Sequence, residues 1–235
     1  MNVFRTVMAA GAAALFAGIL GAGSARADVI YLGDFNRTGT GLGAVPTLLS
    51  IQGKRNDMDR NPTTETGKVG WNGTVDFTTG DTAAHGQNQT RTLGELGVTQ
   101  ARDLRIVLNL NEPGNDSMIT LQDLVVTAYG MNGAVVFTGA YTGPDLNLFD
   151  RGGIGNSGSA FGLDAAQAAQ LQAVYSPNLR IGVESTIINV GGGFETFYGG
   201  SAAKVQNTAI PEPGTMTLLG MGALGALGVI RRRRA

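Results

Sequence analysis

Apolar and polar residues alternate along much of the central part of the chain, which is the pattern of strands with one buried face. The clearest case is 104–110, in which every second residue is leucine or isoleucine. We expect it to be a half-buried strand. The same pattern predicts further strands at 29–32, 45–51, 68–78, 119–129, 134–141, 179–190 and 194–198.

Turn residues separate these segments and favour a meandering β domain. Asn132-Gly133, between two of the predicted strands, suits the positive φ angles of a type I′ hairpin turn. Asp164 is a good N-cap for one short helix over 165–174, which we expect to pack on the sheet edge. The fold class predicted is mainly β: an antiparallel β-sandwich, with a jelly-roll as one form of it.

The first 27 residues follow a different pattern. Arg5 precedes an apolar run over 7–20, and small residues then lead to Ala25-Arg26-Ala27. This is the arrangement of a secretory signal peptide, with the A-x-A site that signal peptidase reads. We expect cleavage before Asp28, so that the mature protein starts outside the cytoplasm. An uncleaved anchor is the alternative.

The last 25 residues contain three parts in order: Pro211-Glu212-Pro213, an apolar segment over 215–230, and the run Arg231, Arg232, Arg233 and Arg234. The two prolines keep the residues around Glu212 extended and unpaired, the form in which proteases bind peptides. The apolar segment is slightly shorter than the roughly 18 to 20 residues of a stable span. The arginines stop transfer and hold the C-terminus in the cytoplasm. An ordinary tail anchor is the alternative.

This order of motif, apolar segment and arginine cluster resembles the PEP-CTERM sorting signal, which the membrane protease exosortase recognises in Gram-negative bacteria. The resemblance implies export, a transient stage in the inner membrane, and processing that leads to the cell surface or extracellular matrix. It also implies an association with exopolysaccharide and biofilm. Because the resemblance is confined to the tail, it transfers no molecular activity to the rest of the chain.

The body between the two targeting segments is long enough for one domain. We divide the chain into a signal peptide (1–27), a β-rich extracytoplasmic domain (28–205), a linker (206–210) and the sorting signal (211–235). The stretch 28–210 holds 11 of the 17 basic and 17 of the 18 acidic residues, so its net charge is −6. This acidic balance argues against nucleic acid as a partner. Cysteine is absent, which excludes thiol chemistry and disulfides.

Several motifs are too weak to assign catalysis. The stretch 153–158 spells G-x-G-x-x-G, but no apolar strand leads into it, so we interpret it as a glycine-rich surface loop. His85 is the only histidine and lies in a polar stretch. A single histidine without cysteine supports neither a zinc site nor a Cys-His pair, and a Ser-His-Asp triad lacks its G-x-S-x-G elbow. We therefore expect no catalytic residues and no cofactor.

Calcium remains an alternative. The stretch from Asp34 to Gly39 matches the first half of an EF-hand loop, but Val45 stands where a bidentate carboxylate is needed. The acidic cluster Asp57, Asp59 and Asn61 is followed by Pro62 where glycine is required. Carboxylates on separate loops could still hold a calcium ion, whereas solvated loop carboxylates are the simpler interpretation.

Trp71, the single tryptophan, is either a core residue or a stacking platform for sugars, and Phe194, Phe197 and Tyr198 share this ambiguity. Three classes of function remain. The first is a non-enzymatic structural or adhesive protein of the surface or matrix, processed by signal peptidase and exosortase. The second is a glycan- or calcium-binding module. The third is a secreted hydrolase with two carboxylates across a cleft.

Overall fold

The computed structural model describes residues 28–35, 45–53, 63–83, 87–111, 118–150, 157–191 and 193–205. The chain divides into two compact units, Met1–Val205 and Gln206–Ala235. All described residues belong to the first unit. Among them, no helix is both long enough and apolar enough to cross a membrane.

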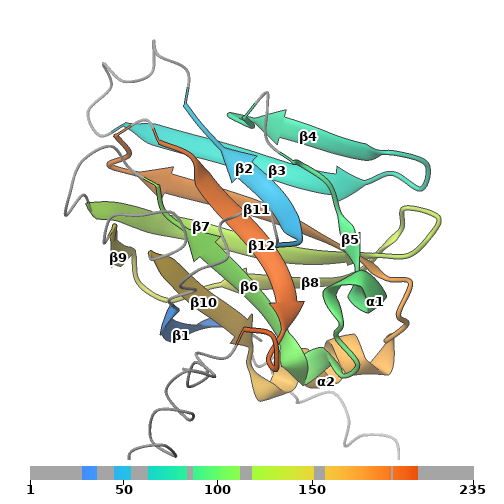
Figure 1. Cartoon of the computed structure of the whole chain (residues 1–235). Coiled ribbons are helices and arrows are strands. Elements are labelled where there is room, and N and C mark those ends of the chain that lie inside the picture. Colours follow the sequence, from blue (N-terminus) through green and yellow to red (C-terminus); the bar gives the residue numbers. More distant parts are fainter. Residues whose placement is uncertain are drawn as a thin grey trace, which may run out of the picture. The chain divides into compact units, whose positions relative to one another are not determined.

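Strands dominate the described part of the chain (Figure 1). The strands are β1 (Asp28–Phe35), β2 (Thr47–Ile51), β3 (Thr64–Trp71), β4 (Asp76–Gly80), β5 (Arg91–Thr92), β6 (Leu104–Asn109), β7 (Met118–Tyr129), β8 (Val135–Tyr141), β9 (Leu146–Phe149), β10 (Gly158–Leu163), β11 (Arg180–Ile188) and β12 (Glu195–Ser201). The helical elements are α1 (Leu93–Leu96), the 3-10 helix η3 (Ala101–Asp103) and α2 (Ala165–Ala173).

All of these strands belong to one 12-stranded sheet, whose main path runs β2-β12-β6-β10-β1-β8-β7-β11-β3-β4. Pairing is antiparallel except between β1 and β8, which run parallel over two residue pairs. The sheet curls so that β2, at one end of the path, meets the segment that follows β4 at the other. The Gln52 N–H donates to the Asp81 carbonyl at 2.8 Å, and the Ala83 N–H donates to the Ser50 carbonyl at 2.9 Å. These bonds satisfy backbone groups that an open edge would leave unpaired.

The main hydrophobic core fills the inside of this curl. Its members come from strands far apart along the sheet path, among them Leu48, Ile106, Leu121, Phe161 and Ile187. A second, smaller cluster covers the other face of β6, β10 and β12; it consists of Phe35, Val45, Val107, Ala160 and Tyr198. The helices α1 and α2 lie together at the lower end of the sheet in Figure 1, where Leu93, Leu96 and Leu171 enter the main core.

The predicted mainly β class is confirmed. The finer prediction of a sandwich or jelly-roll is not confirmed, because the strands form one continuous curled sheet instead of two separate ones. The cause lies in long-range pairings such as β1 with β10 and β6 with β12, which a pattern of buried faces does not encode.

β6 has the alternation that the sequence predicted, but it is not half-buried. Leu104, Ile106 and Leu108 face the main core, while Val107 on the opposite side is fully buried in the second cluster. The segment 36–46 connects β1 with β2, and its described residue Val45 packs against that opposite side. A covered outer face therefore buries every residue of β6 except Arg105, which is half-buried.

The predicted single strand at 68–78 is wrong, because a hairpin turn divides it into β3 and β4. The Asn72 side chain causes the turn: its Oδ1 accepts hydrogen bonds from the N–H groups of Thr74 and Val75, both at 2.9 Å. This is an Asx-type turn, in which the side-chain oxygen takes the place of a backbone carbonyl in closing the turn. Gly73 takes a φ of +97° within it.

The predicted hairpin between β7 and β8 is confirmed, whereas its type I′ turn is wrong. A type I′ turn needs positive φ at both central residues, but of the residues at 132 and 133 only Gly133 has it, with φ +81°. The Gly133 N–H donates to the Gly130 carbonyl at 2.9 Å, and Asn132 Oδ1 accepts from the Ala134 N–H at 3.1 Å. The Gly130 N–H donates to the Ala134 carbonyl at 2.8 Å, so the loop holds the three residues 131–133, one more than a type I′ loop, and Asn132 stabilises it through its side chain.

The predicted helix with Asp164 as N-cap is confirmed as α2, which lies against η3, β1, β8 and β10 rather than on a sheet edge. The expectation of a single helix is wrong, since the structure adds α1. Thr92 and Glu95 form a capping box at its start, and Gly97 ends it with φ +71°. Four residues are too few for a periodic apolar pattern, although the capping sequence Thr92-Leu93-Gly94-Glu95 is a recognisable signal.

Candidate functional site

The residues assigned to sorting lie outside the described part of the chain. These are Pro211, Glu212 and Pro213 of the motif, Arg231–Arg234 of the stop-transfer cluster, and Ala25 and Ala27 before the expected cleavage site. Asp28, on the other side of that site, is described and begins β1. The structure therefore describes one side of one of the two processing junctions.

Asp28 is held by reciprocal bonds to Asp164. Its backbone N–H donates to Asp164 Oδ2 at 3.0 Å, and the Asp164 N–H donates to the Asp28 carbonyl at 3.1 Å. Asp164 is brought there because it follows β10, whose Leu163 pairs with Val29 of β1. Asp28 also pairs with Ala140 at the parallel junction with β8.

Asp164 has a second role as the N-cap of α2. Its Oδ1 accepts from the Gln167 N–H at 2.7 Å, which satisfies one of the free donors of the first helical turn. The pKa of Asp164 is lowered, first because the Gln167 backbone N–H donates to its carboxylate and next because the Asp28 N–H does. One carboxylate thus joins the first residue of β1 to the start of a helix.

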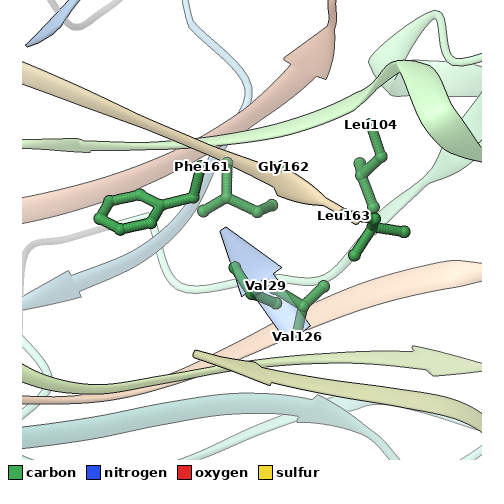
Figure 2. A pocket seen from close by; sticks show the side chains of 7 residues that line it. Val29, Leu104, Val126, Phe161, Gly162 and Leu163 are labelled. Atoms are coloured by element: carbon green, nitrogen blue, oxygen red, sulfur yellow. The ribbon is translucent and has the colours of Figure 1, made fainter. Parts of the chain in front are cut away.

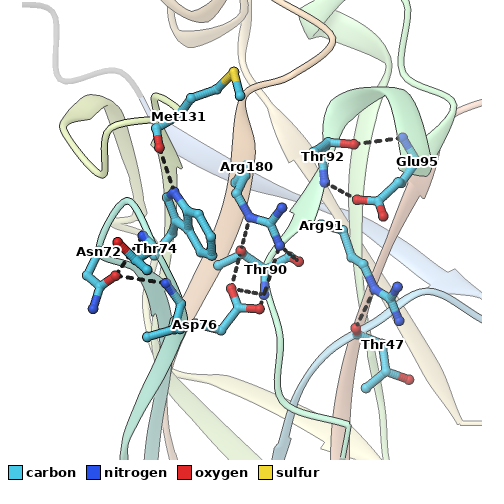
Figure 3. A network of polar contacts seen from close by, with 12 residues as sticks. Thr47, Asn72, Thr74, Asp76, Thr90, Arg91, Thr92, Glu95, Met131 and Arg180 are labelled. Carbon is cyan, nitrogen blue, oxygen red and sulfur yellow. Dashed lines mark hydrogen bonds and ion pairs between the residues drawn. The ribbon is translucent and has the colours of Figure 1, made fainter.

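A network of polar contacts surrounds Arg180 of β11 (Figure 3). Arg180 Nε donates to Thr90 Oγ1 at 2.7 Å, and its Nη2 donates to the Thr90 carbonyl at 3.0 Å. The same guanidinium lies 3.6 Å from Asp76 Oδ2 on β4. Asp76 Oδ1 in turn accepts from the N–H and the hydroxyl of Thr90.

Trp71 belongs to this cluster and is neither a core residue nor an open platform. The Arg180 guanidinium lies over its ring, 4.3 Å from the ring centre, and its Nε1–H donates to the Met131 carbonyl at 3.1 Å. The side chain is half-buried. One ring face and the polar edge are thus already occupied, so the cluster joins β3, β4, β11 and the β7–β8 turn as a structural unit.

The other three candidate sugar-stacking residues differ in their exposure to solvent. Phe197 and Tyr198 are buried, whereas Phe194, immediately before β12, retains 38% exposure. Phe197 faces the main core and Tyr198 the second cluster. These two are therefore core residues and not sugar platforms.

A small apolar gap lies among β1, β6, β7 and β10 (Figure 2). Its wall consists of Val29, Leu104, Ile106, Val126, Phe161, Gly162 and Leu163. The gap leaves no room for a water molecule and has no polar side chain in its wall. It is a packing defect of the main core and cannot hold a substrate.

The candidate calcium and hydrolase residues lie only partly in the described chain. Positions 36–39, 57–61 and His85 are outside it, and the residues that are described contain no group of three acidic or histidine side chains able to hold a metal. Three carboxylates are buried within it: Glu65, Asp150 and Glu195. Glu65 accepts from the Gly53 N–H, and Asp150 accepts from the Ser157 hydroxyl, so each of these two is part of a local hydrogen-bond network.

The prediction of a surface loop at 153–158 is wrong for its last two residues. Ser157 and Gly158 are buried, and Gly158 begins β10. A Cβ at Gly158 would lie 2.2 Å from the Phe35 carbonyl oxygen, so close packing of two strands explains this glycine. The residues 153–156 lie outside the described chain.

The comparison with protein families concerns the tail. Residues 209–234 match the family of the PEP-CTERM protein-sorting motif. The chain carries a PEP-CTERM sorting signal. The searches of curated proteins and of solved structures each found no match.

The PEP-CTERM match confirms the resemblance seen in the sequence. A protein with this motif is exported, passes through a membrane-anchored stage and is processed by exosortase. The match begins at Ala209, four residues after the last described residue, Val205. The family match therefore assigns sorting to the tail and assigns no function to the β-rich residues before it.

Proposed function

We propose that this protein is a non-enzymatic structural or adhesive component of the exopolysaccharide layer, delivered there in two processing steps. Signal peptidase cuts between Ala27 and Asp28. Exosortase then recognises Pro211-Glu212-Pro213 while the apolar segment holds the tail in the inner membrane with its C-terminus in the cytoplasm. The PEP-CTERM match at 209–234 is the observation that carries this proposal.

The two steps have separate chemical requirements, which makes the proposal testable in parts. Replacing Pro211, Glu212 and Pro213 by alanine frees φ at 211 and 213, adds two N–H donors to the motif and leaves the apolar segment unchanged. We expect unimpaired insertion and a loss of processing. The full-length tail then accumulates in the inner membrane of an exosortase-containing host, as measured by fractionation and intact mass.

The matched control replaces Gln206, Asn207 and Thr208 of the linker by alanine. It changes three residues immediately before the sorting signal and leaves the motif intact, so processing should continue at the normal rate. A host without exosortase should reproduce the accumulation seen with the motif variant. Normal release of the motif variant would show that the tail is an ordinary anchor.

The association of the body with polysaccharide needs a separate test. The body carries a net charge of −6, which fits neutral glycans or cation-bridged acidic ones better than polyanions alone. We expect the released protein to cosediment with exopolysaccharide from its host. Repeating the assay with calcium and with a chelator distinguishes direct glycan binding from calcium-dependent binding, and recovery only in the soluble fraction under both conditions would contradict a matrix role.

A further inference from the structure

We propose that Asp164 is the counter-ion of the mature N-terminus, so that removal of the signal peptide creates an ion pair which stabilises the processed domain relative to its precursor. This inference rests on the proposed cleavage before Asp28. The charged group is the ammonium of Asp28, which exists only after cleavage, and the inference places its binding site at Asp164 of the folded domain.

The geometry for this pair is already present. The nitrogen of Asp28 lies 3.0 Å from Asp164 Oδ2 while it is still part of a peptide bond. The reverse bond from the Asp164 N–H to the Asp28 carbonyl fixes the spacing of the two residues. The antiparallel ladder that follows, beginning with Val29 opposite Leu163, holds both backbones in register. The nitrogen therefore need not move to meet the carboxylate.

Cleavage changes the charge of this nitrogen. Hydrolysis of the Ala27–Asp28 bond adds one water molecule, leaving a carboxylate on Ala27 and an amine on Asp28 that is protonated to an ammonium at neutral pH. An amide N–H donates to the Asp164 carboxylate without carrying a charge of its own. An ammonium keeps that hydrogen bond and adds the attraction between two opposite charges.

The surrounding groups favour a positive charge at this point. Asp28 contributes its own carboxylate, and its Oδ1 is buried without a hydrogen-bond partner. β8 places Ala140 opposite Asp28 and Tyr141 opposite Val29, and the neutral Tyr141 hydroxyl donates to the Pro144 carbonyl. The N-terminus of α2 opposes a cation there, but Asp164 stands between it and the Asp28 nitrogen as its N-cap.

The test is a double-mutant cycle on the chain from Asp28 to Ala235, kept in mild detergent. Four proteins are compared: the free and the N-acetylated N-terminus, each with Asp164 and with Asp164→Asn. Acetylation keeps one N–H on this nitrogen, removes its charge, and puts an acetyl group in the place that the Ala27 carbonyl has in the precursor. Asparagine is an equally good N-cap, so the variant retains the Gln167 bond. Urea unfolding is followed by the fluorescence of Trp71, the single tryptophan.

We expect the free N-terminus to raise the folding equilibrium constant about two- to five-fold over the acetylated form at neutral pH, the range of a partly exposed ion pair. In the Asp164→Asn background this ratio should fall to about one. A ratio of one with Asp164 present, or an equal ratio in both backgrounds, would overturn the proposal.

A pH series supplies a second readout. A carboxylate neighbour raises the pKa of the N-terminal amine in the folded state. The extra stability of the free N-terminus is then fully present below the amine's unfolded pKa and is lost as pH rises through the folded one. The acetylated protein should show no such loss. A difference that persists unchanged to high pH would exclude the amine as its source.

This experiment is independent of how the cell processes the precursor. N-terminal sequencing of the exported protein tests the cleavage site itself. A mature N-terminus other than Asp28 would remove the biological role of the pair while leaving the urea result intact. An N-terminus at Asp28 together with equal stability of the free and acetylated forms would leave the processing proposal standing and refute this one.

Discussion

The guanidinium of Arg180 lies over the Trp71 ring, with its central carbon 4.3 Å from the ring centre. Arg180 opens β11 and Trp71 closes β3, so this contact joins the ends of two neighbouring strands. The same guanidinium binds Thr90, which leads into β5. A single planar side chain thus connects three segments that are distant in sequence.

Replacing Arg180 by lysine should destabilise the domain by about 1–2 kcal/mol, because an ammonium cannot donate in a fork and stack on the ring at once. Urea unfolding followed by circular dichroism measures the loss. Arg102→Lys is the matched control, since Arg102 has a side-chain exposure of 73% and only a 4.0 Å contact with Asp103. We expect a change near zero there. Equal effects at both positions would show that the planar contacts of Arg180 do not matter.

Gly133 should resist every substitution, because two constraints coincide there. Its φ is +81°, and an added Cβ would lie 2.3 Å from the Asn72 carbonyl carbon in the β3–β4 turn. Asparagine tolerates positive φ, but its Cβ would meet Asn72 as well. We therefore expect Gly133→Asn and Gly133→Ala each to lower stability by about 2 kcal/mol or more. If asparagine is tolerated and alanine is not, φ alone decides and the contact between the turns is unimportant.

Glu95 should contribute pH-dependent stability through the capping box of α1. The Thr92 N–H donates to Glu95 Oε2 at 2.7 Å, and this bond is the main cause that lowers the pKa of the Glu95 carboxyl. A lowered pKa means stability that is present above the unfolded pKa and lost as pH falls through the folded one. Glu95→Gln should cost about 0.5 kcal/mol at neutral pH, as is usual for a charge at a helix start. The cost should vanish in acid.

Unfolding curves at several pH values check this expectation. Thr92→Ser is the control, because serine also caps the helix and leaves the Glu95 charge in place. Its small effect should not depend on pH. A Glu95→Gln difference that is constant from neutral pH into acid would mean that the charge of Glu95 is not coupled to folding.

We expect the arginines of the tail to control membrane retention, whereas the Pro211-Glu212-Pro213 motif controls processing. Replacing Arg231, Arg232, Arg233 and Arg234 by glutamine removes the charges that resist translocation, while the apolar segment is of marginal length for a stable span. We expect precursor to escape into the extracytoplasmic fraction with its tail uncut, detected by intact mass. Four lysines in place of the arginines should restore retention, since the rule depends on positive charge. Normal retention of the glutamine variant would show that the apolar segment is sufficient by itself.

The sequence by itself determined the features that depend on neighbouring residues. The PEP-CTERM signal is a linear motif, so its recognition in 211–235 needed no fold, and the family match confirmed it. Asp164 as an N-cap, the β7–β8 hairpin and the alternation of β6 follow from local chemistry and were also predicted. Two further local signals are present in the sequence, the turn residue Asn72 and the capping pair Thr92 and Glu95. Because the prediction did not use them, it joined β3 and β4 into one strand and lacked helix α1.

Only the tertiary structure decided which distant residues meet. The single curled sheet depends on pairings such as Thr82 with Ile51, and no periodicity encodes which strand a given strand will join. The same limit hid the contacts of Trp71 with Arg180 and of Asp28 with Asp164, which are 109 and 136 residues apart. Both depend on strand order and register. A sequence pattern shows which face of a strand is buried, whereas its partner is fixed by the cooperative packing of the whole core.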